Sequence, residues 1–491
     1  MIDTNMEEQN TGRAAEWREE LRAAMPAKER TAIPRAKMPQ LDPEFRIHSN
    51  EEVNQGLSAE QAVLEATRCL DCPTPTCVEG CPVNIDIPGF IKNIQRGDVA
   101  EAASVLARTS ALPAVCGRVC PQERQCESRC IYNKMKKEPV AIGYLERYAA
   151  DTVRVNPTES TQYAIKSNGI KVAVVGSGPA GLSFAGDMSA RGFEVHIFEA
   201  LHEIGGVLKY GIPEFRLPNS VVDAELENLA KRGVIFHTDT VVGKTYSYDD
   251  ILSMGFAGLF VASGAGLPRF MGIPGENLIG VMSSNEYLTR INLMGAGKPG
   301  HDTPAPLGKR VAVIGGGNTA MDSVRTSRRM GAEKSMIIYR RGEAEMPARV
   351  EEVHHAKEEG VEFMTLCNPV EYKGDEKGHV KSMLVQRMEL GEPDASGRRS
   401  PVPIPGAIDE IPVDLVIVSV GVSPNPLIPS SIDGLDVTSK GTLAVNDKLQ
   451  TSIPVIFAGG DIVRGGATVI LAMGDGRKAA ASMADKLLAD A

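Results

Sequence analysis

The sequence lacks several features that would place a protein at a membrane or on nucleic acid. It has no run of about 18 apolar residues, so no membrane-spanning helix is predicted. Its first 35 residues are polar and charged, and they do not resemble a signal peptide. The formal net charge of −10 excludes a broad basic surface for nucleic acid or anionic lipid. We therefore expect a cytoplasmic protein without a membrane or nucleic-acid partner.

Histidines with metal-ligand spacing are also missing, which leaves the cysteines as candidate metal ligands. Eight of the nine cysteines form two runs, Cys69-x2-Cys72-x4-Cys77-x3-Cys81-Pro82 and Cys116-x3-Cys120-Pro121-x5-Cys126-x3-Cys130. Thiolates at such short intervals, with proline after a cysteine in each run, are typical of iron–sulfur ligation. Two clusters with four ligands each would use all eight cysteines. On spacing alone Cys116 is therefore a ligand, and Glu146 belongs to a solvated helix face.

Two other interpretations of the cysteines remain open at this point. Zinc sites usually pair two short hooks across a longer gap, which fits four cysteines within thirteen residues poorly. Disulfide scaffolds are typical of short secreted chains, whereas this chain has 491 residues.

Helix signals surround these cysteines. Ser58-x-x-Gln61 predicts the capped start of a helix that delivers Cys69 at its end. Pro88 is expected to open a second helix, and Asp98-x-x-Glu101 caps a third. We expect residues 1–40 to form a flexible arm, because nothing periodic anchors them.

A first strand–glycine–helix unit begins at Lys171. In its turn Gly176 permits the tight bend, Gly178 lets the backbone approach a pyrophosphate, and Gly181 lets the helix pack on the strand. Glu199 ends the next strand, where a carboxylate can bind both hydroxyls of a ribose. This unit predicts FAD or NAD, and a plain glycine turn is the alternative. The predicted site also includes Pro179 and Ala180.

A second unit of the same kind begins at Arg310, with Gly315 and Gly317 in its turn. No carboxylate follows its second strand; Arg340 and Arg341 do, and guanidinium groups can bind a 2′-phosphate. The unit therefore predicts NADPH, and a solvated loop is the alternative for the two arginines. The predicted site also includes Asn318, Thr319 and Ala320.

Two nested dinucleotide units indicate a flavin facing a nicotinamide. Glycine pairs allow the backbone to close on a flavin, and Asp461 can bond its ribityl chain, although each stretch can also be a plain turn. The candidate flavin contacts here are Gly205, Gly206, Leu208, Gly460, Asp461 and Thr468. No redox Cys-x-x-Cys follows the first glycine turn, which argues against a disulfide reductase.

The expected fold class is α/β: an N-terminal helical iron–sulfur domain followed by two nested Rossmann-like domains. We expect a helical domain at 41–165, an FAD-binding domain at 166–300 and 415–491, and an NADPH-binding domain at 301–414. Gly295 to Gly308 is rich in glycine and proline and is expected to cross between domains. Glu392 to Ile411 is expected to be a loop.

Beyond these patterns, the chain resembles a known family from about Leu41 to Leu488. This is the family of the small (β) subunit of NADPH-dependent glutamate synthase. It also includes the large subunit of NADH-dependent ferredoxin:NADP⁺ oxidoreductase and the N-terminal half of dihydropyrimidine dehydrogenase. The resemblance lies in Cys116-Gly-Arg-Val-Cys-Pro-Gln, Ile142-Gly-Tyr-Leu-Glu-Arg147, Gly205-Gly-Val-Leu-Lys-Tyr-Gly-Ile-Pro213, Gly315-Gly-Gly-Asn-Thr-Ala-Met-Asp322 and Phe457-Ala-Gly-Gly-Asp-Ile-Val-Arg-Gly465.

The resemblance implies interleaved ligation of two [4Fe-4S] clusters. One cluster would take Cys69, Cys72, Cys77 and Cys130. The other would take Cys81, Cys120, Cys126 and Glu146, leaving Cys116 without a metal.

The resemblance also implies a function as an electron-input subunit. Electrons would pass from NADPH through FAD and the clusters to a partner, such as a glutamate synthase large subunit. An electron-accepting flavin/iron–sulfur subunit, as in a bifurcating transhydrogenase, is the alternative partner. A zinc-binding NADP(H) sensor is an alternative of another class. No catalytic side chain is expected, because the cofactors supply the chemistry.

Overall fold

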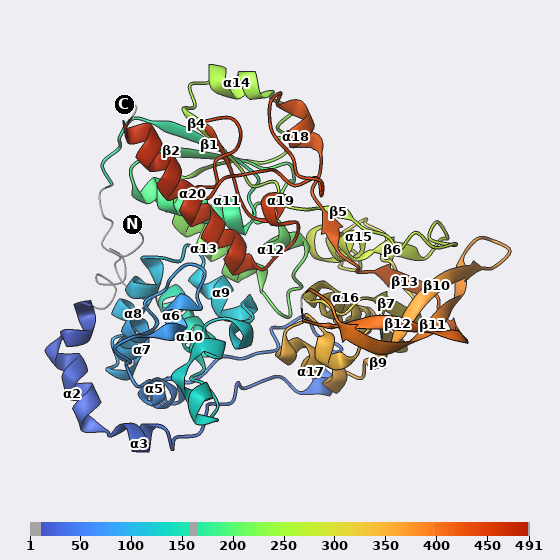
Figure 1. Ribbon diagram of the computed structural model, residues 1–491, viewed down its shortest axis with the longest axis horizontal. Coiled ribbons are helices and arrows are strands. Elements are labelled where there is room, and N and C mark those ends of the chain that lie inside the picture. The colour runs from blue at the N-terminus through green and yellow to red at the C-terminus, as the bar shows by residue number, and fades with distance from the viewer. Residues whose placement is uncertain (1–10, 157–164, 396, 490–491) are drawn as a thin grey trace.

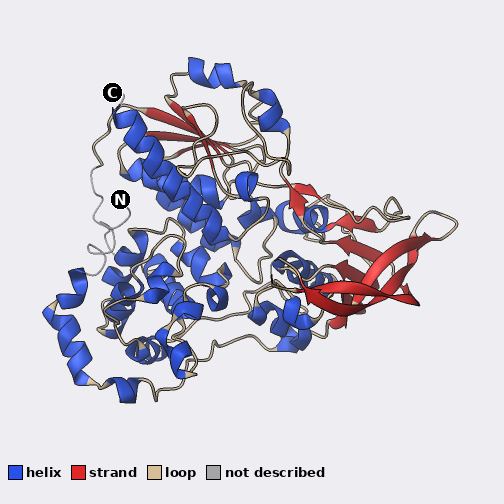
Figure 2. Ribbon diagram, in the orientation of Figure 1, coloured by secondary structure: helices blue, strands red, loops and turns tan. Residues whose placement is uncertain are grey.

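The computed structural model describes residues 11–156, 165–395 and 397–489. Figure 1 shows three regions: a helical N-terminal part, a sheet crossed by the long helix α20, and a second sheet from which a twisted hairpin projects. Figure 2 shows that ordered structure in the N-terminal part is helical, whereas each later part contains strands. The α/β fold class predicted from the sequence is confirmed. No helix among the described residues is long and apolar enough to span a bilayer.

The helical part is built as its local signals predict. Ser58 and Gln61 form a capping box at the start of α5, and Cys69 is the residue that ends this helix. Asp98 caps α8 by accepting a hydrogen bond from the backbone of Glu101. The elements are η1 (Thr11–Ala14), α2 (Glu16–Ala24), α3 (Ala27–Arg30), α4 (Pro43–Arg46), α5 (Ala59–Arg68), α6 (Thr76–Glu79), α7 (Ile87–Gln95), α8 (Val99–Ala107), α9 (Pro113–Val119), η2 (Gln122–Arg124), η3 (Glu127–Arg129), η4 (Ile131–Met135) and α10 (Ile142–Val155).

The prediction of a flexible arm is wrong for residues 11–40. Helix α2 packs on the first cysteine run, where Arg18 and Arg22 form ion pairs with the fully buried Asp71. Arg30 donates a hydrogen bond of 3.0 Å to the backbone carbonyl of Cys69. The charged residues of this segment look solvated in sequence because their partners lie far along the chain. Residues 1–10 lie outside the described part.

The first sheet is parallel, in the order β15-β4-β1-β2-β3. Helix α11 packs against α20, and Ser183 of α11 donates a hydrogen bond of 3.0 Å to the carbonyl of Met473. The elements are β1 (Lys171–Val175), α11 (Pro179–Ala190), β2 (Glu194–Phe198), α12 (Val207–Tyr210), α13 (Asn219–Lys231), β3 (Ile235–His237), α14 (Tyr248–Ser253), β4 (Gly258–Val261), α18 (Leu427–Ser431), β15 (Ile456–Ala458), α19 (Asp461–Arg464) and α20 (Val469–Ala489).

The second sheet is also parallel, in the order β6-β13-β7-β8-β9. Its elements are β6 (Val281–Ser283), α15 (Ser284–Leu288), η5 (Thr289–Leu293), β7 (Arg310–Ile314), α16 (Asn318–Arg329), β8 (Lys334–Tyr339), η6 (Glu343–Glu345), α17 (Val350–Glu358), β9 (Glu362–Thr365) and β13 (Leu415–Val418).

The chain passes between the two sheets at other places than the sequence indicated. Strands β6 and β13 lie in the second sheet, although the expected boundaries at 300 and 415 assigned both to the first. The two passes run side by side as an antiparallel pair, β5 (Leu267–Pro268) with β14 (Val422–Ser423). Short apolar strands such as β13 fit either sheet equally well, so their sequence does not decide membership.

A three-stranded antiparallel sheet forms the hairpin that projects on the right of Figure 1. It consists of β10 (Cys367–Gly374), β11 (Val380–Pro393) and β12 (Arg399–Pro412). The prediction of a loop from Glu392 to Ile411 is therefore wrong. The edge strand β12 is largely exposed and rich in proline, so it lacks the apolar alternation by which strands are recognised.

Candidate cofactor sites

One large cavity of about 1850 Å³ opens between the two parallel sheets. The carboxyl ends of parallel strands of both sheets meet there, as at the ligand crevice of other open α/β sheets. Most predicted cofactor residues line it: Gly176, Gly178, Pro179, Ala180, Glu199, Gly206, Gly315, Gly317, Asn318, Thr319, Arg340, Arg341, Gly460, Asp461 and Thr468. Four others do not: Gly181, Gly205, Leu208 and Ala320.

The glycines of the first turn differ in their surroundings. A methyl group on Gly178 would point into open space, so the backbone here leaves room for a ligand. A methyl group on Gly181 would lie 2.1 Å from the carbonyl oxygen of Gly176, so close packing of α11 on β1 requires glycine. Helix α11 begins at Pro179, and because Pro179 and Ala180 line the cavity, the N-terminal end of the helix borders it and favours an anion there.

Glu199 is buried at the cavity wall, and its carboxylate is held by the first glycine turn. Oε2 accepts hydrogen bonds from the backbone N–H and the hydroxyl of Ser177, at 2.9 and 2.6 Å. Oε1 accepts one of 2.9 Å from the backbone of Leu201. A carboxylate has about four lone-pair sites, so both oxygens can still accept from a ribose. Ser177 was not singled out in the sequence because serine is common in such turns.

The two arginines after β8 have different environments. Arg340 is exposed at the cavity wall. Arg341 is buried, and its guanidinium donates to the carbonyl of Arg399 at 2.9 Å and to Asp394 at 2.7 Å. Arg398, on the same hairpin turn, also lines the cavity. Sequence reasoning missed Arg398 because it lies in a segment expected to be a loop far from the glycine turn.

A buried carboxylate supports the predicted flavin contacts near β15. Asp475 accepts hydrogen bonds from the backbone of Gly460 at 3.0 Å and from Arg464 at 2.7 and 2.6 Å. Asp461 lines the cavity and accepts from the backbone of Ala467 at 2.9 Å. Its own burial raises the pKa of the Asp461 carboxyl. Asp475 lies inside an ordinary helical pattern, which gave no sign of this role.

The cysteines fall into two groups that do not follow the two runs. Cys69, Cys72, Cys77 and Cys130 form the outer group, whose side chains are half-buried. Burial raises the pKa of Cys72 to about 11, with the charges of Cys69 and Cys130 adding to the shift. Burial also raises the pKa of Cys77, again with the charges of Cys69 and Cys130 adding to the shift.

The inner group is formed by four buried cysteines and one buried glutamate: Cys81, Cys116, Cys120, Cys126 and Glu146. The charge of Glu146 contributes to raising the pKa of each of the four thiols. Burial raises the pKa of Glu146 to about 8, and Glu225 adds to that shift. The thiol of Cys116 lies 3.5 Å from the sulfur of Met473, on α20.

Both groups offer donors that suit a metal cluster. All nine cysteines are free thiols in the structure. No three His, Cys, Asp or Glu side chains of the described residues converge as ligands of a single ion do. Oε1 of Glu146 is buried and accepts no hydrogen bond from any described residue, so the inner group contains an oxygen donor without a partner. The residues present therefore fit iron–sulfur ligation, either with Glu146 or with Cys116 as the eighth ligand.

Two family models match the chain. The 4Fe-4S model of dihydropyrimidine dehydrogenase domain II matches residues 46–158, and the pyridine nucleotide-disulphide oxidoreductase model matches residues 170–476. The second match alone covers more than half of the chain.

Several curated relatives are similar over most of their length. The glutamate synthase [NADPH] small chain of Azospirillum brasilense is 38% identical over 87% of this chain and 90% of its own. The corresponding protein of Escherichia coli (strain K12) is 39% identical over 87% of this chain and 92% of its own. The NADP(+)-dependent formate dehydrogenase subunit beta of Moorella thermoacetica is 38% identical over 84% of this chain and 59% of its own.

Among solved structures, Mycobacterium tuberculosis FprA in complex with NADPH has a TM-score of 0.56 at 21% identity, covering 65% of this chain and 85% of that one. This likeness supports the fold alone. Together, the family models and the curated relatives establish what the geometry indicated. The chain belongs to the pyridine nucleotide-disulphide oxidoreductase family, in the group that adds a 4Fe-4S domain and includes glutamate synthase small chains; it is an NADPH oxidoreductase with FAD and 4Fe-4S clusters.

Proposed function

We propose that this chain is the electron-input subunit of a larger enzyme, taking electrons from NADPH and delivering them to a partner protein. The observation that carries the proposal is the order of the sites. Val119, beside Cys120 of the inner group, lines the cavity, and the outer group is less buried than the inner one. A route from cavity to inner group to outer group therefore leads electrons out of the protein.

We assign FAD to the first glycine turn and NADPH to the second. With these cofactors bound, the chemistry that they supply is hydride acceptance from NADPH and release of single electrons to the clusters. The chain itself binds the two cofactors, orients them and encloses them. Glu199 and the start of α11 would hold the adenosine half of FAD, and Arg340 with Arg398 would face the 2′-phosphate of NADPH.

The division of the chain follows from sheet membership. We propose a cluster-binding domain at 11–165, an FAD-binding domain at 166–280 and 419–491, and an NADPH-binding domain at 281–418. Strands β6 and β13 pair within the second sheet, which supports these boundaries over those at 300 and 415.

For the clusters we propose the interleaved ligand sets. The outer cluster takes Cys69, Cys72, Cys77 and Cys130, and the inner cluster takes Cys81, Cys120, Cys126 and Glu146. The unpartnered Oε1 of Glu146 supports its assignment, while the sulfur contact between Cys116 and Met473 gives that thiol a packing role. Each cluster then joins segments that are distant in sequence, so the order of the domain depends on metal.

For the partner we propose a glutamate synthase large subunit, so that the complex makes glutamate from glutamine and 2-oxoglutarate. The support is the likeness to glutamate synthase small chains over 87% of this chain. The likeness to a formate dehydrogenase subunit keeps a different electron-accepting partner as the alternative. Free thiols suit a reducing compartment, so we place the protein in the cytoplasm.

The test is to purify the chain anaerobically, alone and with whatever protein co-purifies from its host. Alone, we expect it to contain flavin and iron, to oxidise NADPH with an artificial acceptor and to make no glutamate. With its partner, glutamine and 2-oxoglutarate should yield glutamate. Zinc without iron would contradict the electron-transfer role, and a partner without glutamine chemistry would contradict only the pathway.

A further inference from the structure

One loop of the flavin-side region reaches into the nucleotide-side region and is buried there. It runs from Pro213 to Pro218, between α12 and α13, and contains Phe215 and Arg216. Phe215 is 1% exposed, and Arg216 lines the large cavity. The partners of both side chains lie on α16 and α17, in the second parallel sheet unit. Two residues from one unit are therefore embedded in the other.

Arg216 forms a buried ion pair across this boundary. Its Nη1 donates to Oδ2 of Asp322 at 2.8 Å, and its Nε lies 3.5 Å from Oε1 of Glu352. Asp322 is 3% exposed and lines the same cavity as Arg216. The pair therefore joins the two units at the wall of the site where both cofactors would meet.

Phe215 is held by two further cations of α16. The guanidinium of Arg325 lies 4.7 Å from the centre of its ring, and that of Arg329 lies 3.8 Å away. Arg325 and Arg329 are in turn ion-paired with Glu359, at 2.8 Å each. Cation–π contacts gain strength when, as here, the partners are removed from water.

Helix geometry explains why these contacts lie on one face of α16. Asp322, Arg325 and Arg329 are spaced three and four residues apart, so they share one face of the helix. The first residue of the same helix, Asn318, lines the cavity beside the second glycine turn. One rigid element therefore carries the nucleotide-binding turn at its end and the contacts to the flavin-side loop along its side.

We propose that Phe215 and Arg216 position the NADPH site relative to the flavin site, by fixing the side of α16 through Asp322, Arg325 and Arg329. This inference rests on the proposed assignment of NADPH to the second glycine turn. Rotation or sliding of α16 would move that turn relative to the opposite cavity wall. Arg216 and Asp322 are thus positioning residues, and nucleotide binding itself does not require them.

The test compares holoenzymes in which one ion pair is neutralised. Arg216→Met with Asp322→Asn removes the bridging pair without leaving a lone charge. The control, Arg310→Met with Asp414→Asn, removes a more exposed pair of 2.6 Å that lies within the second sheet unit and does not join the two units. For each, flavin and iron content, the Kd for NADP⁺, and the rate of flavin reduction at saturating NADPH are measured.

For the bridging variant we expect cofactor contents and the Kd to stay within about threefold, whereas flavin reduction slows at least about tenfold, because small misplacements of reacting groups cost large factors in rate. Hydrogen exchange should rise in residues 213–217 and along α16. The control should show neither change. The single change Arg216→Lys keeps the positive charge, so this variant should keep most of the rate of flavin reduction of the unaltered protein.

Equal losses in the Kd and the rate would overturn the proposal, because the pair would then act by binding nucleotide. Unchanged reduction with unchanged exchange would overturn it as well. If the double variant does not fold, Phe215→Leu provides the same comparison while keeping an apolar side chain. If NADPH fails to reduce even the unaltered protein, the proposed function is wrong, and the exchange data still decide whether the loop joins the two units.

Discussion

The two cysteine groups lie in one small helical region, yet their surroundings differ. The outer group is half-buried and has cations beside it. Lys92, which is fully buried, and Arg30 both donate to the carbonyl of Cys69, at 2.5 and 3.0 Å. The inner group is buried beside the carboxyls of Glu146 and Glu225, and burial raises the pKa of these carboxyls to about 8 and about 7.

This difference bears on the direction of electron transfer in the proposed function. Positive charge stabilises a cluster that gains an electron, and negative charge disfavours that gain, because local charge tunes the potential. In the proposed function, Lys92 and Arg30 would therefore favour electron transfer from the inner cluster to the outer one. The exposure of the two groups agrees, since the outer group is half-buried and the inner group is buried.

The largest effect is expected from removing one ligand of each group. Cys126→Ser should abolish both clusters, because Cys126 lies in the core and only the turn η3 separates it from Cys130 of the outer group. Cys77→Ser should remove only the outer cluster, about half of the iron. Loss of the inner site should lower the free energy of unfolding by at least about 4 kcal/mol. Iron analysis and thermal unfolding measure both effects. Equal iron contents in the Cys126→Ser and Cys77→Ser variants would refute the expected difference between the two groups.

A smaller effect is expected within the inner group. Glu146→Ala should lose at least about half of the iron, while Cys116→Ala should keep all of it, because we assign Glu146, and not Cys116, as the cluster ligand. Glu146→Gln keeps an oxygen donor and tests whether charge or donor type matters. Iron content and the visible spectrum are the measurements. Full iron in Glu146→Ala, with a loss in Cys116→Ala, would make the cysteine the ligand.

Local signals in the sequence were sufficient for part of this architecture. The caps at Ser58 and Asp98 and both glycine turns are where the sequence placed them, because each depends on residues within one turn of chain. Pro88 is the second residue of α7, one position later than expected.

Contacts between distant segments could not be predicted. The pairs of Arg18 with Asp71 and Arg216 with Asp322 join residues 53 and 106 positions apart, and each member looks like an ordinary surface charge in sequence. The interleaved cysteine sets came from the family resemblance, since spacing alone could not separate Cys116 from Glu146 as a ligand.

Helix α2 provides a third way to test the difference between the groups, because Arg18 and Arg22 pair with Asp71, which lies between Cys69 and Cys72 of the outer group. Arg18→Met with Asp71→Asn removes a buried ion pair that holds α2 on the first cysteine run. Iron of the outer cluster should then pass to a chelator about tenfold faster. A tenfold change in rate corresponds to about 1.4 kcal/mol in free energy, which is below the usual cost of breaking a buried ion pair. The inner cluster should keep its rate.

Limited proteolysis should also cut residues 11–40 in this variant. The control is Arg108→Gln with Glu101→Gln, which removes an exposed pair between α8 and the residue that follows it. Such exposed pairs contribute at most about 1 kcal/mol. If the control changes iron loss as much as the α2 variant does, residues 11–40 do not protect the outer site.

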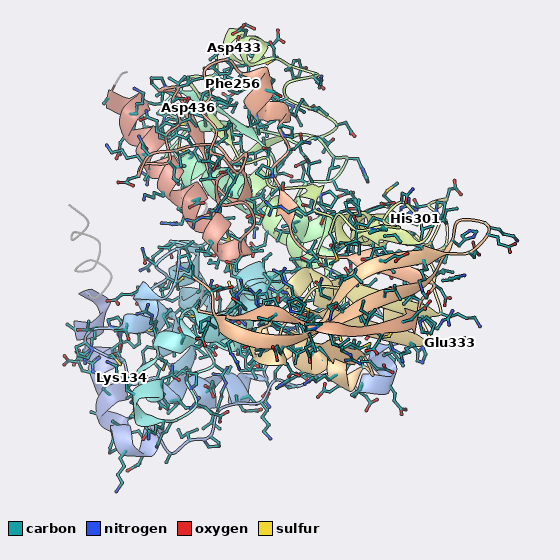
Figure 3. All side chains as sticks on the ribbon, turned by 45° about the vertical axis from the view of Figure 1, so that its right-hand side comes forward. Lys134, Phe256, His301, Glu333, Asp433 and Asp436 are labelled. Carbon is teal, nitrogen blue, oxygen red and sulfur yellow. The ribbon has the colours of Figure 1, made fainter. Side chains whose placement is uncertain are left out.

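The smallest effect should come from the surface beside the outer group. Lys134 is exposed on the helical region, four residues after Cys130 (Figure 3). If electrons leave here, Lys134→Glu should slow NADPH-driven reduction of an anionic acceptor such as ferricyanide by about twofold at low ionic strength, and the difference should vanish at high salt. Lys440→Glu, an exposed change in the first sheet unit, is the control. A cationic acceptor should respond to Lys134→Glu in the opposite sense, because the reversed charge attracts it; equal responses to both acceptors would place the exit elsewhere on the surface.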